Sequence, residues 1–363
     1  MVSIQSVLLA LPALAATVAA HYKQVQGHAD AKYSVVTGFF KQDEDSTNVT
    51  TFSHMDNLGL LDNLTWTDIK NQLKEYNDNA PLNTTYKLIY YARHAEGYHN
   101  AAETYFGEDL WNCYLTTLYG NGTTEWGPDA YLTEKGIQSA VNNSKLIKSL
   151  IAEDFPLPKS FYVSPFTRCA DTLLLTWNDT VLAPGYATPV FKEGIREIIG
   201  IDTCDQRRDR AYLEARYGWE FEANFQNDDL LWQADKREDA GRLFWRARQV
   251  LDDVFNSDEN DVISITAHSD IGAGFLRAVG HRVFPLSTGA IIPLFVKQEK
   301  SLNFYPAALN SNITIGEWET VPACPATLSI SRIASDIAFS TMSVPEKYSV
   351  MTVTTVSTVT PSA

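Results

Sequence analysis

Four short apolar runs alternate with helix-like segments along the middle of the chain. They occupy residues 87–92, 160–163, 262–265 and 290–296. Between them, Thr133 is placed to cap a helix that runs toward Ile151, and residues 239–255 put their apolar side chains on one helical face. Strands that alternate with helices predict a three-layer α/β/α sandwich around a largely parallel sheet. Pro293 in the last run suggests an edge strand or a bulge.

Basic and nucleophilic side chains follow three of these runs. Arg93 and His94 come directly after the first run, Arg168 shortly after the second and His268 shortly after the third. In open α/β sheets, ligands bind outside the carboxyl ends of the strands, so we expect these four side chains to converge there. A neutral imidazole can attack phosphorus, and arginine forks match the oxygens of a phosphoryl group. The pattern therefore favours phosphoryl chemistry.

The segments that carry these residues resemble the motifs of the histidine phosphatase superfamily, which is also called phosphoglycerate mutase-like. The matching segments are 93–100 (Arg-His with a later Asn), 132–138 (Leu-Thr-x-x-Gly-x-Gln), 164–168 (Ser-Pro-x-x-Arg), 195–200 (apolar-x-Glu ending in Gly) and His268. The resemblance spans roughly residues 86–300 and implies the phosphoglycerate mutase-like fold. Ala95 stands where the family usually has glycine, and if that position needs a positive φ, the alanine costs roughly 1 kcal/mol.

The resemblance also implies a role for each matching residue. His94 is expected to be the nucleophile and Glu197 the leading proton donor, with Glu96, Glu193 and Asp270 as alternatives. His268 belongs to the catalytic set and also to the residues expected to hold the phosphoryl group, which are Arg93, Asn100, Arg168 and His268. His99 is expected at the rim of the pocket or in a structural role.

The function that these roles predict is hydrolysis of small-molecule phosphomonoesters through a phosphohistidine, without a metal or cofactor. Two alternatives stay open at this point. One is a phosphoglycerate-type phosphomutase, and the other is a catalytically inactive secreted protein that binds phosphorylated ligands. The net charge of −15 argues against nucleic acid and anionic membranes as partners. No apolar run reaches about 18 residues, so no membrane span is expected.

Two features predict a secreted glycoprotein. Residues 1–20 contain an apolar stretch, Val7 to Leu14, and end in Val18-Ala19-Ala20, the pattern of a signal peptide that is cleaved after Ala20. The chain also carries seven Asn-x-Ser/Thr acceptor sites for glycans. These sites are Asn48, Asn63, Asn83, Asn121, Asn142, Asn178 and Asn312.

The rest of the chain divides by composition. Residues 21–82 form a polar extension expected to pack on the main domain, residues 83–335 the histidine phosphatase domain, and residues 336–363 a Ser/Thr-rich tail. An aromatic insert between Asn100 and Leu132 is a candidate cap for the pocket. Four cysteines allow three pairings. Because Cys169 and Cys204 fall in segments that resemble the family's functional motifs, the resemblance favours a disulfide between Cys113 and Cys324.

Overall fold

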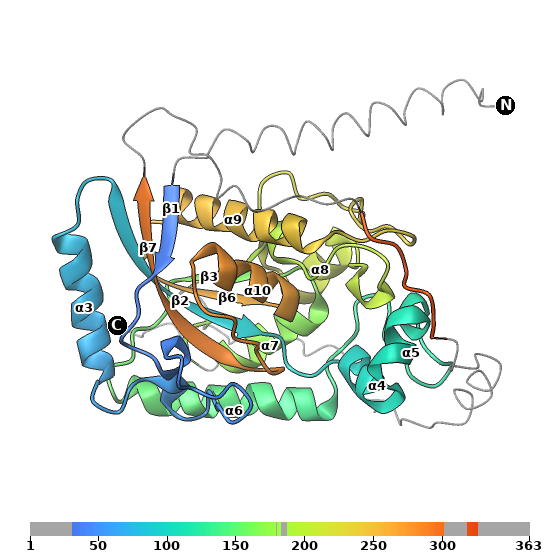
Figure 1. Cartoon of the computed structure of the whole chain (residues 1–363), viewed down its shortest axis with the longest axis horizontal. Coiled ribbons are helices and arrows are strands. Elements are labelled where there is room, and N and C mark those ends of the chain that lie inside the picture. The colour runs from blue at the N-terminus through green and yellow to red at the C-terminus, as the bar shows by residue number, and fades with distance from the viewer. Residues whose placement is uncertain (1–30, 179, 183–186, 301–317, 326–363) are drawn as a thin grey trace, which may run out of the picture.

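A computed structural model describes residues 31–178, 180–182, 187–300 and 318–325 (Figure 1). Its strands form one sheet of order β1-β7-β2-β6-β3-β4-β5. The strands are β1 Ala31–Val35, β2 Thr84–Arg93, β3 Ser160–Val163, β4 Val190–Phe191, β5 Glu220–Phe221, β6 Val262–Ala267 and β7 Ile291–Lys300. β2, β6, β3, β4 and β5 run parallel to one another, whereas β7 is antiparallel to both β2 and β1. The sheet is therefore largely parallel, as predicted.

Helices cover both faces of this sheet. They are α3 Trp66–Asp78, α4 Tyr98–Phe106, α5 Glu108–Cys113, α6 Glu134–Ile151, α7 Thr167–Trp177, α8 Arg210–Tyr217, α9 Ala240–Ser257 and α10 Ser269–Ala278. Short 3-10 helices occupy Lys41–Asp43, Asn57–Gly59, Leu115–Thr117, Glu193–Ile195 and Thr203–Asp205. In Figure 1, α9 lies along the top of the sheet and α6 along the bottom. This arrangement confirms the three-layer α/β/α sandwich.

The central strand β2 shows how the two faces are built. Ile89 and Tyr91 pack in the hydrophobic core that α9 and α10 close, whereas Leu88 and Tyr90 pack in the core that α3, α6 and α7 close. Alternate side chains of a strand point to opposite faces, so a strand between two helical layers is apolar at successive positions. This is why the run at residues 87–92 is continuous rather than alternating.

The structure tests the predicted helix cap at Thr133 and the predicted place of Pro293 in the sheet. Thr133 caps α6, and its hydroxyl accepts a hydrogen bond from the N–H of Gly136 at 3.1 Å. The expectation that Pro293 marks an edge strand is wrong for β7, which lies between β1 and β2. However, β1 pairs only with residues 296–300 of β7. Pro293 therefore lies beyond the last paired residue on that side, where a missing N–H is tolerated.

The described part of the N-terminal extension joins the same sheet. β1 pairs with β7 at the edge, and α3 packs against β2 through Trp66, Ile69 and Leu73. Within the described residues, no helix is both long enough and apolar enough to cross a membrane. The expected signal peptide at residues 1–20, the glycan acceptor Asn312 and the tail at 336–363 lie outside the described residues.

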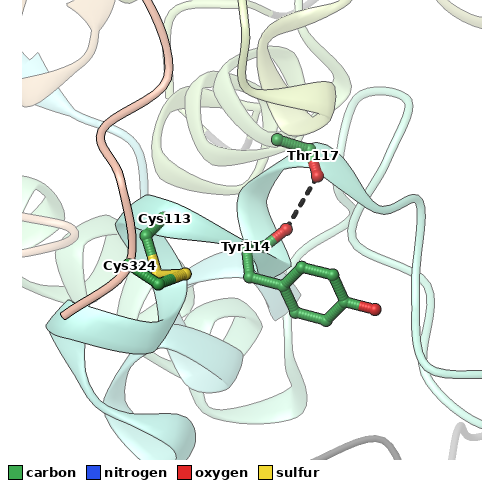
Figure 2. Close-up of a disulfide and its surroundings, with 4 residues drawn as sticks. All are labelled: Cys113, Tyr114, Thr117 and Cys324. Carbon is green, nitrogen blue, oxygen red and sulfur yellow. Dashed lines mark hydrogen bonds between the residues drawn. A yellow bond between two sulfur atoms is a disulfide. The ribbon is translucent and has the colours of Figure 1, made fainter. Parts of the chain in front are cut away.

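One disulfide links α5 to the last described segment, residues 318–325. Cys113, the last residue of α5, is bonded to Cys324, and their Cα atoms are 4.9 Å apart (Figure 2). This is the pair that the resemblance favoured. Cys169 and Cys204 are free thiols, and both are buried. The bond ties residues 318–325 to the insert formed by α4 and α5, which lie together at one end of the molecule (Figure 1).

Candidate active site

The parallel strands deliver the predicted residues to one edge of the sheet. Arg93 of β2 pairs with Ala267 of β6, and Val163 of β3 pairs with Thr266 of β6. The next residues of the three strands are therefore neighbours: His94, Ser164 and His268 follow β2, β3 and β6. The backbone N–H of His94 donates to the carbonyl of Ala267 at 2.9 Å. The sheet register thus places both predicted histidines side by side.

His94 is buried and held in one orientation. Its Nδ1 lies 2.8 Å from the carbonyl oxygen of Ala95. A carbonyl can only accept, so Nδ1 carries the proton of the neutral ring and Nε2 keeps a lone pair. Burial, together with the positive charges of Arg168 and Arg93, holds the pKa of His94 well below its usual range. His94 is therefore a neutral imidazole with a nucleophilic nitrogen.

The loop after His94 is packed closely against α6. Ala95 is absent from the residues with positive φ in the described chain, and its methyl group packs against Leu132. The strain that alanine would cause in a left-handed conformation therefore does not arise. Its N–H donates to Thr172 Oγ1 at 2.9 Å. A Cβ at Gly136 would lie 2.1 Å from the carbonyl oxygen of Glu96, so the glycine lets α6 approach this loop.

Asn100 is the third residue of α4, the helix that follows this loop. Its Oδ1 accepts a hydrogen bond from the N–H of Gly97 at 3.1 Å. This contact fixes the turn between His94 and α4, because it satisfies a donor at the helix N-terminus. The contact that the structure shows for Asn100 is with the backbone, and its expected contact with the phosphoryl group stays a prediction.

Arg168 lies in the first turn of α7, and its guanidinium is fully buried. One terminal nitrogen donates to the carbonyl of Cys204 at 2.7 Å, and the other to Asp205 Oδ1 at 2.6 Å. The guanidinium also lies over the ring of Phe166, 4.3 Å from its centroid. These contacts hold the fork in one position, which bidentate binding of phosphoryl oxygens requires.

Two carboxylates that hold Arg168 were missed by sequence reasoning. One is Asp205, described above. The other is Asp129, which is fully buried, accepts hydrogen bonds from the N–H of Thr167 at 2.9 and 3.0 Å, and lies 3.8 Å from Arg168. Neither stands next to Arg168 in the chain, and neither belongs to a segment that matches a family motif. Only the folded structure brings them together.

His268 completes the contact between β6 and α7. Its Nε2 lies 2.7 Å from Ser164 Oγ, and its Nδ1 lies 3.3 Å from a terminal nitrogen of Arg168. Its ring centroid is 5.0 Å from that of His94. Burial, and then the charge of Arg168, lower the pKa of His268 well below its usual range. His268 is therefore a neutral, hydrogen-bonded neighbour of the nucleophile.

His99, expected at the rim of the pocket or in a structural role, is buried and lies beside the nucleophile. It is buried on the first turn of α4, and its ring centroid is 5.2 Å from that of His94. The signal that could have identified it is its place in the segment 93–100, one residue before Asn100. Three imidazoles, rather than the two expected, therefore meet at this edge of the sheet.

Two buried guanidinium donors of the site have no hydrogen-bond partner within the part of the chain that the structure describes. Arg93 donates through one terminal nitrogen to the carbonyl of Leu286 at 2.7 Å, but its Nε has no partner among the described residues. The same holds for Nε of Arg168 within this part of the chain. Buried polar groups are almost always hydrogen-bonded in folded proteins. Unpaired guanidinium N–H groups beside a nucleophile are suited to the oxygens of a bound anion.

Glu197 lies at the N-terminus of α10, the helix that begins directly after His268. One carboxylate oxygen accepts from the N–H and hydroxyl of Ser269 at 3.1 and 3.0 Å. The other accepts from the N–H groups of Asp270 and Ile271 at 3.0 and 3.2 Å. Burial, and then the negative charge of Asp270, raise the pKa of Glu197 to about 7. Glu197 can therefore gain or lose a proton near neutral pH.

The three alternative proton donors differ in the hydrogen bonds and ion pairs that they form. Glu96 contacts Thr133 and Lys135 on α6. Glu193 is paired with both Arg196 and Arg207. Asp270 is largely exposed, although partial desolvation by the protein around its carboxyl group raises its pKa above the usual value. Of the three alternatives to Glu197, Asp270 is the one that lies close to Glu197 and Arg93, since its charge acts on Glu197 and the charge of Arg93 acts on it.

Among the described residues, no group of three or more His, Cys, Asp or Glu side chains is arranged to hold a metal ion.

Comparison with known proteins assigns the family. The chain is 34% identical over 286 residues to a probable phosphoglycerate mutase from Arthroderma benhamiae, a match that covers 74% of this chain and 85% of that protein. It is 35% identical over 277 residues to phosphomutase-like protein 3 from Candida albicans, covering 76% of this chain and 83% of the other. The chain therefore belongs to the phosphoglycerate mutase-like family of the histidine phosphatase superfamily.

The other comparisons add little to this assignment. No family model matches the chain. Among solved structures, the ecdysone phosphate phosphatase of Bombix mori in complex with tungstate aligns with 67% of this chain and 95% of its own, at 13% identity and a TM-score of 0.37. That likeness is too distant to bear on function.

Proposed function

We propose that this protein is a secreted phosphomonoesterase that hydrolyses phosphate esters through a phosphohistidine on His94. The observation that carries the proposal is the setting of His94. Its ring is neutral, Nδ1 is held by a carbonyl, and unpaired N–H groups of Arg93 and Arg168 are buried nearby. A neutral nucleophile surrounded by fixed positive charge suits attack on an anionic phosphate ester.

The first half of the reaction transfers the phosphoryl group to the protein. Nε2 of His94 attacks phosphorus with its lone pair, a P–N bond forms, and the P–O bond to the leaving group breaks. The leaving oxygen takes the electron pair of that bond and a proton from Glu197. Arg93 and Arg168 stabilise the negative charge on the phosphoryl oxygens, and His268 supports Arg168.

The second half regenerates the protein. A water molecule attacks phosphorus, the P–N bond breaks, and its electron pair returns to Nε2 of His94. Glu197, now a carboxylate, accepts the proton that the water loses. The products are inorganic phosphate and the neutral ring of His94.

A phosphomutase is the second candidate, because both relatives reported above carry mutase-like names. The two reactions share the phosphohistidine and differ in what accepts the phosphoryl group. A phosphoglycerate-type mutase depends on a bisphosphorylated cofactor, which is a cytosolic metabolite and should be scarce outside the cell. The signal-like segment at residues 1–20 and the seven glycan acceptors favour an extracellular protein, for which water is the abundant acceptor.

The positions of the glycan acceptors support the proposal that the protein is secreted. Six of the seven lie within the described residues, and none of these six is buried. Asn48, Asn63 and Asn178 are exposed, and the other three are partly exposed. An acceptor asparagine must be accessible to carry a glycan, and these six meet that condition.

The experiment that separates the candidates compares two rates on the same purified, secreted protein. Phosphate release from a panel of phosphomonoesters is measured beside isomerisation between 2- and 3-phosphoglycerate. We expect release to exceed isomerisation on every substrate. Isomerisation that outpaces release would favour the mutase. Glycosidase treatment of the same material should lower its apparent mass, and an unchanged mass with retention in the cytosol would refute secretion.

A further inference from the structure

We propose that His99, the third imidazole of the site, binds the transferring phosphoryl group through a hydrogen bond from its ring N–H to a non-bridging oxygen. The inference rests on the proposed function and deepens it. It adds a ligand to the set that the sequence predicted, since His99 was expected only at the rim or in a structural role.

His99 lies close to the nucleophile in a fixed position. The ring of His99 is as close to the nucleophile as that of His268, with centroid distances to His94 of 5.2 and 5.0 Å. Its plane is tilted by 48° to that of His94, so the two rings are not stacked face to face. The side chain is 8% exposed and comes from the first turn of α4, whose start is fixed by Asn100. His99 therefore lies in a defined place beside the reacting nitrogen.

The ring nitrogens of His99 are not engaged by the described part of the protein. The buried Nδ1 of His99 has no partner among the described residues, and no hydrogen bond of its Nε2 is formed within them either. Other buried histidines differ: His281 is bonded to Arg282 and Asp43, and His268 to Ser164. Since the described residues engage neither nitrogen, the ring can donate to a ligand oxygen without breaking an existing hydrogen bond.

The surroundings of Nδ1 indicate which nitrogen binds. A Cβ at Gly97 would lie 2.7 Å from Nδ1, so this nitrogen is packed against the Gly97 backbone. A proton on Nδ1 would have no acceptor there, whereas a proton on Nε2 is free to meet a ligand oxygen. We therefore place the N–H of the neutral ring on Nε2.

Burial and the positive charge of the site keep the His99 ring neutral. Burial, and then Arg168, His94 and Arg93, lower the pKa of His99 well below its usual range. The same two arginines lower the pKa values of His94 and His268, so all three rings share one electropositive site. The groups that act on the His99 ring are the two arginines and His94, whose own ring is neutral. A neutral N–H can donate to an anion there without adding a repelling charge.

The test uses His99→Gln, His99→Asn and His99→Leu in the full-length protein. A glutamine amide reaches approximately the position of imidazole Nε2, an asparagine amide that of Nδ1, and leucine has no donor. Orthophosphate affinity is measured by calorimetry, and kcat/KM with an aryl phosphate. His281→Asn is the matched control, because His281 is also 8% exposed but lies outside the pocket. We expect this control to keep the orthophosphate affinity and kcat/KM of the wild type.

We expect His99→Leu to lose roughly 10- to 100-fold in both quantities, the scale of one hydrogen bond to a charged group. His99→Gln should recover most of this loss and His99→Asn little of it. The role of His99 would be overturned if the His99→Gln and His99→Asn variants melt at the wild-type temperature and have equal orthophosphate affinity and kcat/KM. It would also be overturned if His99→Leu binds orthophosphate as tightly as the wild type. If the Leu variant does not fold, the comparison of Gln with Asn decides.

Failure of this inference can be distinguished from failure of the proposed function. The proposed function is refuted if the wild-type protein binds orthophosphate but hydrolyses no phosphomonoester. In that case, the difference in orthophosphate affinity between His99→Gln and His99→Asn still decides the role of His99. A wild-type protein that hydrolyses phosphomonoesters, with His99→Leu unchanged, refutes only the role of His99.

Discussion

Asp205→Ala removes the carboxylate that holds the phosphate-binding arginine. Asp205 ends the short helix Thr203–Asp205, is buried, and accepts a hydrogen bond from Arg168 at 2.6 Å. The arginine is buried as well, so water cannot replace the lost partner. The substitution therefore tests whether Asp205 positions Arg168 for chemistry or only stabilises the fold.

The structure sets the size of the expected effects. Removing one partner of a buried ion pair costs about 3–5 kcal/mol of unfolding free energy. We expect about 3 kcal/mol here, since Arg168 keeps the carbonyl of Cys204 and the carboxylate of Asp129 at 3.8 Å. A guanidinium that moves by about 1 Å can cost on the order of 100-fold in rate, so kcat/KM should fall by that factor. Asp205→Asn keeps one oxygen acceptor and should lose less of both.

The assay combines urea unfolding with kcat/KM for one phosphate ester, measured on both variants. Asp43→Asn is the matched control, because Asp43 forms a buried pair with His281 at 3.2 Å, outside the phosphate pocket. The control should lower stability and leave kcat/KM unchanged. If Asp205→Ala also lowers stability while keeping the wild-type kcat/KM, Asp205 does not position Arg168, and the reasoning is refuted.

Three further predictions follow from the site and the disulfide. Turnover needs neutral His94 and protonated Glu197. We therefore expect kcat/KM to stay high in mildly acidic buffer, because the low pKa of His94 keeps its ring neutral there, and to fall above a pH of about 7 as Glu197 ionises. A kcat/KM that rises between pH 7 and 9 would contradict this expectation. Glu197→Gln should slow alkyl phosphates more than aryl phosphates, and equal losses would favour Asp270 as the acid. Cys113→Ser with Cys324→Ser opens a loop of 211 residues and should cost about 2–5 kcal/mol in urea unfolding; an unchanged midpoint contradicts it.

The strand-end residues were predictable because their pattern is local. A buried parallel strand is a continuous apolar run, and the residue after it must lie at the sheet edge. Arg93, His94 and His268 follow from that rule alone, and the order of the motifs supplied their roles. The cap on α6 was also local, since Thr133 precedes the helix that it caps.

The supporting contacts could not be predicted in this way. Asp129 and Asp205 are 38 and 37 residues from the α7 groups they bind, and nothing in their own segments indicates a buried arginine. Glu197 caps α10 across 72 residues, a contact that appears only when β6 and the 195–200 segment are brought together. His99 stands in a matching segment, but its unpaired ring is a property of the packed structure.

The most direct test of the central claim is to trap the phosphohistidine. Wild-type protein is mixed with a radiolabelled phosphate ester, quenched within milliseconds under alkaline conditions that preserve phosphohistidine, and digested for peptide mapping. We expect an acid-labile label on the peptide that contains His94, and no label in His94→Ala, which should also lack turnover. Full turnover by His94→Ala, or a label on another residue, would contradict the account.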